Sequence, residues 1–200
     1  FYSGGPKLMT LPGRGAKIDA QALKTRIAGI RKDVHQVQPA AISITNATEY
    51  GLSWRAGEVG EISEIAKGAG MKLHMDGARF ANAVAFLGCS PADVTWRAGV
   101  DALSFGFTKN GAMMAEAIVF FGGSGGPGVR ELKKRGGHLL SKGRFVAAQI
   151  RAMLANDLWL TNARAANAGA AKLAAACGGR LMYPVEANGV VVRLAGEEGA

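Results

Sequence analysis

Two segments decide the fold: KLHMDGARFANA at residues 72–83 and DALSFGFTKNG at residues 101–111. Each begins as an apolar run typical of a buried strand and then reaches a charged residue where the chain turns. This residue is Asp76 in the first segment and Lys109 in the second. In an open α/β sheet, ligands bind just beyond the carboxyl ends of the strands. We therefore expect a ligand site in which this carboxylate and this amine hold opposite ends of one flat molecule.

Strand-like and helix-like segments alternate along most of the chain. This alternation predicts an α/β fold built on a sheet. After about residue 178, two apolar runs predict short strands of a second, α+β unit. The expected strands are residues 7–11, 40–45, 72–76, 101–107, 115–121, 180–186 and 189–194, and the expected helices are 20–32, 57–69, 80–87, 91–96, 129–156 and 158–176. Glycines at 136, 137 and 143 predict that the 129–156 stretch is kinked or divided into two helices.

The composition is that of a globular protein, with 48% hydrophobic and 20% charged residues in a chain of 200. No apolar run reaches the length of about 18 residues that a membrane-spanning helix needs. Cys89 and Cys177 have no spacing typical of zinc ligands or of a disulfide framework, which favours a cytoplasmic location and no metal site. The first residues lack both a start methionine and a signal pattern, so we expect a fragment.

The formal net charge of +9 raises the question of nucleic-acid binding. The 24 lysine and arginine residues are scattered, and the densest group, at residues 130–135, is interrupted by Glu131 and Leu132. Aromatic side chains interleaved with basic ones, which stack on bases in single-strand binders, are missing from this group. We therefore expect neither nucleic acid nor membrane as a partner.

Taken singly, Lys109 and Asp76 are ambiguous. A lysine at a half-buried strand end is costly unless it is paired or neutral, and the neutral amine is a nucleophile that forms an imine with an aldehyde. The alternative is a surface lysine in a loop. Similarly, an aspartate followed by glycine is commonly a turn former. Their combination in one chain, with Arg79 close behind Asp76, is what favours a catalytic site.

Four segments together resemble the low-specificity L-threonine aldolases, a branch of the fold type I pyridoxal-phosphate enzymes related to the β-eliminating lyases. They are SITNATEYG at 43–51 and the stretches 57–83, 98–121 and 134–150. The resemblance implies a chain containing the latter part of a large mixed-sheet α/β domain and the beginning of a small α+β domain. The implied divisions are residues 1–156 for the large domain, 157–177 for a connecting helix and 178–200 for the small domain.

The resemblance also implies roles for single residues. Lys109 would bind pyridoxal phosphate as a Schiff base, and Asp76 would pair with the protonated pyridine nitrogen. Ala78 would pack beneath the ring, and Arg79 would hold the substrate carboxylate with its planar fork. Thr108 matches a position near the cofactor phosphate, although its hydroxyl could instead cap its own turn.

Two further residues are possible members of the site. His74 precedes Asp76 by two residues and so points to the same side of the strand, where it could support that carboxylate or be an ordinary strand histidine. Glu49 follows the strand at 40–45 and could handle a proton or orient a substrate. These assignments stay open at the level of sequence.

The implied reaction is retro-aldol cleavage of L-threonine or L-allo-threonine to glycine and acetaldehyde. The implied partners are this small β-hydroxy amino acid and further copies of the same chain, arranged as a dimer of dimers. One alternative is another pyridoxal-phosphate-dependent lyase or β-hydroxy-amino-acid aldolase. A different alternative is a non-catalytic remnant or binding module. The sequence leaves the preference between threonine and allo-threonine open.

Overall fold

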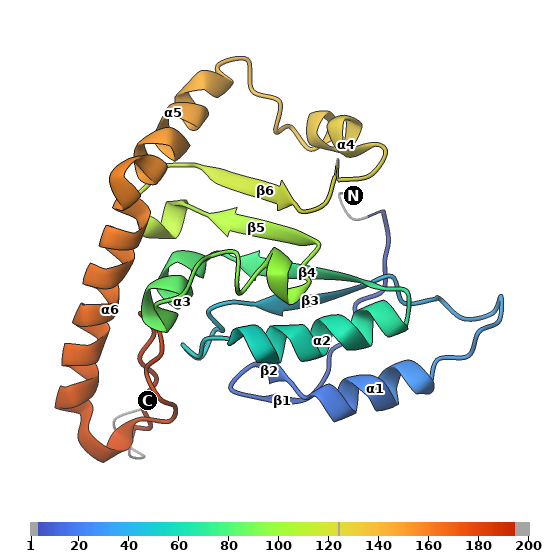
Figure 1. The fold of residues 1–200 in the computed structure, drawn as a ribbon, viewed down its shortest axis with the longest axis horizontal. Helices are drawn as coiled ribbons and strands as arrows, with labels where there is room; N and C mark the ends of the chain where they lie inside the picture. The colour runs from blue at the N-terminus through green and yellow to red at the C-terminus, as the bar shows by residue number, and fades with distance from the viewer. Residues whose placement is uncertain (1–3, 124, 195–200) are drawn as a thin grey trace.

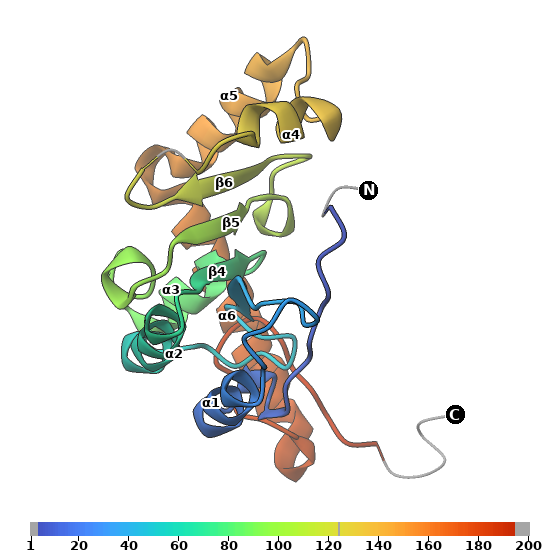
Figure 2. The same ribbon diagram turned by 90° about the vertical axis from the view of Figure 1, so that its right-hand side faces the viewer.

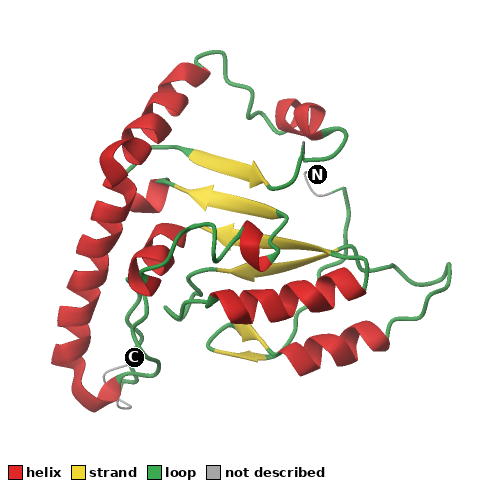
Figure 3. Cartoon of the chain, in the orientation of Figure 1, coloured by secondary structure: helices red, strands yellow, loops and turns green. Residues whose placement is uncertain are grey.

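The computed structural model describes residues 4–123 and 125–194. Its centre is a four-stranded sheet in the order β3-β4-β5-β6 (Figure 1; Figure 3). The strands are β3 (Ala41–Thr45), β4 (Lys72–Gly77), β5 (Ala102–Gly106) and β6 (Glu116–Phe120). β3, β4 and β5 run parallel, whereas β6 is antiparallel to β5. The expected mixed α/β sheet is confirmed.

Alternating side chains divide the sheet into a buried and a more open face. Ile44, Met75 and Leu103 are almost fully buried, and they face the layer formed by α2 (Ala56–Gly68) and α3 (Phe80–Leu87). On the other face, Ser43 is exposed and Ile118 is 66% exposed. Figure 2 shows α2 and α3 on one side of the sheet and the N-terminal segment running along the other. The period-2 pattern of the strands explains this division.

Helices α1 (Ala20–Ala28) and α2 begin where the sequence predicts. The carboxylate of Asp19 caps α1 by accepting a hydrogen bond from the Ala22 amide at 2.7 Å. Glu58 caps α2 by accepting from the Arg55 amide at 2.7 Å, and Lys17 pairs with Glu58 at 2.7 Å. α1 is shorter than the expected 20–32 because Gly29 ends it.

Two predictions, one near the N-terminus and one after α3, are wrong in detail. Residues 7–11 form no strand, and the hairpin of β1 (Gly13–Arg14) and β2 (Lys17–Ile18) follows them instead. Leu8 is 89% exposed and therefore gains nothing from a strand conformation. The expected helix at 91–96 is a series of turns that ends in a short 3₁₀ helix at Trp96–Ala98. The Thr95 hydroxyl donates to the Pro91 carbonyl at 2.7 Å, which favours a turn over a continuing helix.

The glycine interruption in the long helical stretch is confirmed. It separates α4 (Val129–Arg135) from α5 (Gly143–Leu154), and α6 (Leu158–Cys177) follows after a short 3₁₀ turn. In Figure 1, α6 runs along the edge at which β3, β4 and β5 end. None of the described helices is long and apolar enough to cross a membrane.

The two strands expected at 180–186 and 189–194 are reduced to one bridge between Leu181 and Val192. Two backbone hydrogen bonds flank this bridge, from the Met182 amide to the Val191 carbonyl at 2.9 Å and from the Arg193 amide to the Arg180 carbonyl at 2.8 Å. Farther along, Glu186 bonds to another part of the chain. The amide of Glu186 donates to the carbonyl of Gly51, and its side chain also contacts that loop. This segment therefore lies against the loop 46–55, which connects β3 to α2.

Candidate active site

The end of β4 presents Asp76 in a tight turn. Asp76 lies beside Thr45 of β3 and Ser104 of β5 in the strand register, and its carbonyl accepts from the Asn46 amide at 2.9 Å. Its Oδ1 accepts from the Ala78 amide at 2.9 Å, which closes the turn. The side chain is half-buried. Oδ1 therefore closes the turn, and Oδ2 makes no hydrogen bond to another of the described residues.

Lys109 occupies the 3₁₀ turn Thr108–Asn110 directly after β5. Two hydrogen bonds fasten this turn to α6: Asn110 Nδ2 donates to the Trp159 carbonyl at 2.8 Å, and Asn162 Nδ2 donates to the Asn110 carbonyl at 2.9 Å. Lys109 itself is exposed, not half-buried as the sequence suggests. The amide side chain of Asn110 makes the inward contact at this turn, and Lys109 is left on the outer side.

Arg79 and Glu49 meet at the same edge of the sheet. Arg79 is the residue before α3, and its Nη1 lies 3.3 Å from Oε1 and 3.4 Å from Oε2 of Glu49. The side chain of Arg79 is 28% exposed and that of Glu49 is 67% exposed. A guanidinium that already holds a carboxylate at the strand ends is suited to binding the carboxylate of an amino acid.

Two glycines allow the ends of β4 and β5 to lie unusually close. A Cβ at Gly106 would stand 2.7 Å from the Ala78 Cα and 2.8 Å from its carbonyl oxygen. A Cβ at Gly77 would stand 2.7 Å from both the Leu103 Cδ1 and the Ser104 carbonyl oxygen. The backbone of Gly106 packs directly on that of Ala78, so the turn after Asp76 lies against the end of β5 that leads into the Lys109 turn. Such a glycine-lined edge suits a flat ring.

Replacing Gly106 with alanine is expected to destabilise the fold at the site. The added methyl group would press into the backbone of Ala78, and overpacking of this kind costs about 1–3 kcal/mol. Urea unfolding of the full-length protein measures the loss. Gly60→Ala in α2 is the matched control, because a Cβ there meets nothing within 4 Å and alanine favours a helix. Equal stability of Gly106→Ala and the wild type would contradict the close contact.

The sequence pattern of the β-eliminating lyases matches residues 2–197. The chain belongs to the β-eliminating lyase family. Within this family it is 43% identical over 198 residues to the low specificity L-threonine aldolase of Pseudomonas sp. and 44% identical to that of Pseudomonas aeruginosa. Each alignment covers 97% of this chain and 57% of the relative. The chain thus spans little more than half the length of the curated lyases it matches.

Solved structures of the lyase family agree with the fold. The threonine aldolase of Leishmania major superposes with a TM-score of 0.84 at 30% identity, covering 92% of this chain and 55% of that one. A second structure, described as a putative L-allo-threonine aldolase of Listeria monocytogenes, gives a TM-score of 0.63 at 22% identity. The latter likeness concerns the fold alone.

His74 lies in a row of three polar side chains across the open face of the sheet. Its Nδ1 lies 2.8 Å from the Ser43 hydroxyl and its Nε2 lies 2.9 Å from the Ser104 hydroxyl. Burial lowers the pKa of His74, and the negative charge of Asp76 offsets only part of that effect. A neutral imidazole bonded on both sides ties β3, β4 and β5 together. Both ring nitrogens of His74 bond to serines, so in this structure its side chain aligns the strands and makes no hydrogen bond to Asp76.

Thr108 makes two contacts with the start of β6. Its hydroxyl lies 3.4 Å from the Ala115 carbonyl, and its amide donates to Oε1 of Glu116 at 3.2 Å. The hydroxyl thus contacts the residue before β6 and not its own turn, and Thr108 is exposed. Glu116 is a residue that sequence reasoning missed. Its register partner is Gly106, so the hairpin between β5 and β6 brings its carboxylate to the lysine turn.

Asn46 was also missed, although it directly follows a buried strand. It is fully buried, and its side chain spans the loop 46–55 by accepting from the Trp54 amide at 3.1 Å and donating to the Trp54 carbonyl at 3.3 Å. A buried asparagine must satisfy both ends of its amide, and here it does so within one loop. The signal for Asn46 in the sequence is an amide side chain placed directly after a buried strand.

Asn82 makes a second contact between the site and α6. Asn82 Nδ2 donates to Asn167 Oδ1 at 3.0 Å, and Asn167 Nδ2 donates to the Asn82 carbonyl at 2.9 Å. Asn82 lies in the first turn of α3, three residues after Arg79. Helix α6 therefore holds both the lysine turn and the helix that follows Arg79.

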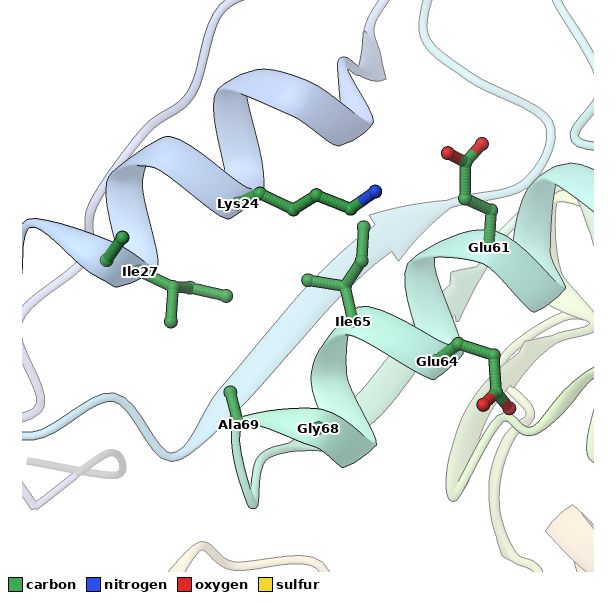
Figure 4. A pocket seen from close by; sticks show the side chains of 8 residues that line it. Lys24, Ile27, Glu61, Glu64, Ile65, Gly68 and Ala69 are labelled. Atoms are coloured by element: carbon green, nitrogen blue, oxygen red, sulfur yellow. The ribbon is translucent and has the colours of Figure 1, made fainter.

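A pocket elsewhere on the surface is separate from these residues. It lies between α1 and α2, where Ile27 and Ile65 form its apolar floor and Lys24, Glu61 and Glu64 stand around it (Figure 4). None of the predicted site residues lines it. The candidate active site is the strand-end cluster, and this pocket is not part of it.

Proposed function

We propose that the protein containing this chain is a pyridoxal-phosphate-dependent aldolase that cleaves L-threonine and L-allo-threonine to glycine and acetaldehyde. The observation that carries this proposal is the presence of Asp76 and Lys109 on the ends of two neighbouring parallel strands, with Arg79 beside them. The identity of 43–44% to two low specificity L-threonine aldolases supports the choice of substrate.

The residues present fit the cofactor by the chemistry of their groups. β-Eliminating lyases and threonine aldolases depend on pyridoxal phosphate, which supplies an electron sink for breaking a bond at the amino acid Cα. Lys109 supplies the amine for its aldehyde carbon, and Asp76 supplies the anion for its pyridine nitrogen. Ala78 offers a small side chain on the glycine-lined edge that would lie against the ring, and the Thr108 hydroxyl would be a donor for the phosphate.

Arg79 binds the substrate carboxylate in this proposal. Its guanidinium is held at the strand ends by Glu49 at 3.3 Å, so it is already oriented for a carboxylate. Fixing the carboxylate removes rotational freedom at the substrate Cα, which lets the site select which bond to that carbon breaks. In this proposal, fixing the substrate favours cleavage of its Cα–Cβ bond over cleavage of its Cα–H bond.

Glu49 serves as the proton-handling or orienting group at the β-hydroxyl. It is 67% exposed, and its carboxylate lies 3.3 Å from Nη1 of Arg79. A carboxylate accepts the hydroxyl proton as a general base, and its negative charge also orients Arg79. In this proposal, His74 supports Asp76 by aligning β3, β4 and β5 through its hydrogen bonds to Ser43 and Ser104.

The domain divisions stay a proposal. Residues 1–156 would be the latter part of the large domain, 157–177 the connecting helix and 178–200 the start of the small domain. The observed α6, Leu158–Cys177, supports the position of the connecting helix. Residues 195–200 lie outside the described residues. We further propose a homo-oligomer built as a dimer of dimers, a cytoplasmic location consistent with the free Cys89 and Cys177, and no nucleic-acid or membrane partner.

A second candidate keeps the cofactor and changes the reaction to β-elimination or to cleavage of another β-hydroxy amino acid. The match to the β-eliminating lyase family pattern over residues 2–197 favours it. The different-class alternative, a remnant without activity, is disfavoured because Asp76, Arg79 and Lys109 are all intact.

Two measurements on the full-length protein test the proposal. Borohydride reduction in the presence of pyridoxal phosphate, followed by peptide mass mapping, is expected to label Lys109. Acetaldehyde release is then measured from L-threonine and L-allo-threonine separately. A label on other lysines alone would refute the cofactor assignment, and release of ammonia with a 2-oxo acid in place of acetaldehyde would identify an eliminating lyase.

A further inference from the structure

One residue of the C-terminal segment, Glu186, hydrogen-bonds to the loop 46–55. Glu186 Oε2 accepts from the Ser53 amide at 2.9 Å, and the Glu186 carbonyl accepts from the Ser53 hydroxyl at 2.7 Å. The Glu186 amide in turn donates to the Gly51 carbonyl at 3.1 Å. Ser53 is fully buried under these contacts. Glu186 thus fixes the loop through its side chain and through its own backbone.

An ion pair between Arg55 and Glu186 adds to these hydrogen bonds. Arg55 Nη2 lies 2.9 Å from Glu186 Oε1, and Arg55 Nη1 lies 3.3 Å from Glu186 Oε2, which is the two-pronged geometry of a guanidinium on a carboxylate. Burial would raise the pKa of Glu186, but the hydrogen bonds from Arg55 and from the Ser53 amide, with the charges of Arg55 and Lys17, hold it below its ordinary value. Glu186 is therefore ionised at neutral pH.

The packing around the ion pair leaves little room for the loop to shift. A Cβ at Gly51 would stand 2.7 Å from the Gly189 carbonyl oxygen, so the two backbones are in direct contact. The rings of Tyr50 and Tyr183 lie 5.0 Å apart. Ala187 is buried together with Ala47 of the loop and with one alanine of α3. The C-terminal segment is thus fitted against the loop along most of its length.

The same loop carries Glu49 toward the candidate active site. Glu49 stands two residues before Gly51, and the tight turn joining them is closed by the Gly51 amide donating to the Thr48 carbonyl at 2.9 Å. The Leu52 amide donates to the Thr48 hydroxyl at 3.2 Å. Because the turn is internally bonded, it moves as a unit. A displacement of Gly51 or Ser53 would therefore carry Glu49 away from Arg79.

We propose that Glu186 is a positioning residue that acts through Glu49. By holding the loop 46–55, it sets where the Glu49 carboxylate stands beside Arg79 and so how well the substrate carboxylate is bound. This inference rests on the proposed function of Arg79 and Glu49. It also gives the C-terminal segment a part in the reaction although it contacts neither Asp76 nor Lys109 in the hydrogen bonds of the described residues.

A double-mutant cycle in the full-length enzyme, with pyridoxal phosphate bound and L-threonine as substrate, tests the proposal. Glu186→Gln keeps an acceptor for the Ser53 amide and removes the charge that holds Arg55. We expect KM to rise about tenfold with a smaller change in kcat, within the roughly hundredfold loss that misplaced groups can cause. In a Glu49→Gln background, the same substitution is expected to cause no further loss, because its effect passes through Glu49.

Three further measurements keep the outcome decisive. Arg55→Ala removes the same ion pair from the loop side and is expected to reproduce the rise in KM, so one misfolded variant does not end the test. Glu64→Gln, which alters an exposed glutamate of α2, is the matched control and is expected to leave KM unchanged. Hydrogen exchange of peptides covering residues 46–55 is expected to quicken in Glu186→Gln.

Equal losses in the wild-type and Glu49→Gln backgrounds would overturn the proposal and leave Glu186 a purely structural residue. An unchanged KM or unchanged exchange of the loop would overturn it as well. Failure of the proposed function itself is visible earlier and separately, as a wild-type protein that releases no acetaldehyde from L-threonine.

Discussion

Lys109→Ala in the full-length protein is expected to abolish the borohydride-stable adduct and to lower the rate of threonine cleavage by roughly 10³-fold or more. The proposed reaction requires an amine at this position, and alanine has none. The fold should survive, because the Lys109 side chain is exposed and the turn is held by Asn110 and α6. Acetaldehyde release and absorbance of the bound cofactor measure the two effects.

The matched control for this experiment is Lys172→Ala, which removes an exposed lysine from α6. It should retain both the adduct and the activity of the wild type. If Lys109→Ala cleaves threonine at the wild-type rate, the amine at position 109 has no part in the reaction. Both variants should melt within a few degrees of the wild type, which separates loss of chemistry from loss of fold.

Asp76→Asn is expected to lower kcat/KM for threonine on the order of 10²- to 10³-fold, as removal of other preorganised electrostatic groups does. The substitution keeps an oxygen that accepts from the Ala78 amide, so the turn can persist while the negative charge is lost. The cofactor nitrogen then has no anion to keep its proton. Steady-state kinetics and the absorption spectrum of the bound cofactor report the change.

Asp93→Asn serves as the control for Asp76→Asn, since Asp93 is a partly exposed aspartate paired with Arg97 outside the strand-end cluster. It is expected to leave kcat/KM near the wild-type value. Wild-type kinetics in Asp76→Asn would show that the charge of this carboxylate does not act in the reaction. A full loss of cofactor binding, with the fold intact, would instead extend its role to holding the cofactor.

The strand ends could be predicted from the sequence because two local signals coincide there. Leu73 and Met75 alternate with polar neighbours, which is the period of a half-buried strand, and a glycine after Asp76 marks the turn. Alternation of strands with helices then gives a parallel arrangement that brings strand ends to one edge. The positions of Asp76 and of the Lys109 turn follow from these rules, whereas the role expected for Arg79 came from the resemblance to the threonine aldolases.

The contacts that set the site could not be predicted, because they join residues far apart in the chain. Glu186 reaches Ser53, and Asn162 reaches Asn110, through hydrogen bonds that leave no local pattern. The exposure of Lys109 was also missed, because the sequence shows two apolar strands around the turn but not which side of it faces outward. Periodicity describes one element at a time, whereas these properties depend on how elements meet.

The hydrophobic runs near the C-terminus led to an error for a similar reason. RLMYPVE and GVVVRL have the composition of strands, yet in the described residues they pair only around Leu181 and Val192, where two backbone hydrogen bonds join them. Glu186, farther along the first run, bonds to the loop 46–55 instead. Composition favours an extended conformation for these runs. It does not reveal that Glu186 bonds to Ser53 and Arg55, which lie far away in the sequence.

The two asparagine contacts of α6 have a consequence for how chain length can vary. Asn162 holds the lysine turn and Asn167 holds Asn82 near Arg79. Five residues separate the two, which is about 7.5 Å along a helix axis. The rise of helix α6 between Asn162 and Asn167 therefore helps to set the spacing between the Lys109 turn and the start of the helix that follows Arg79. Inserting one residue between 162 and 167 would rotate one of the two asparagines by about 100° relative to the other and break its contact. Residues added after Asn167 would leave the spacing of the two asparagines unchanged.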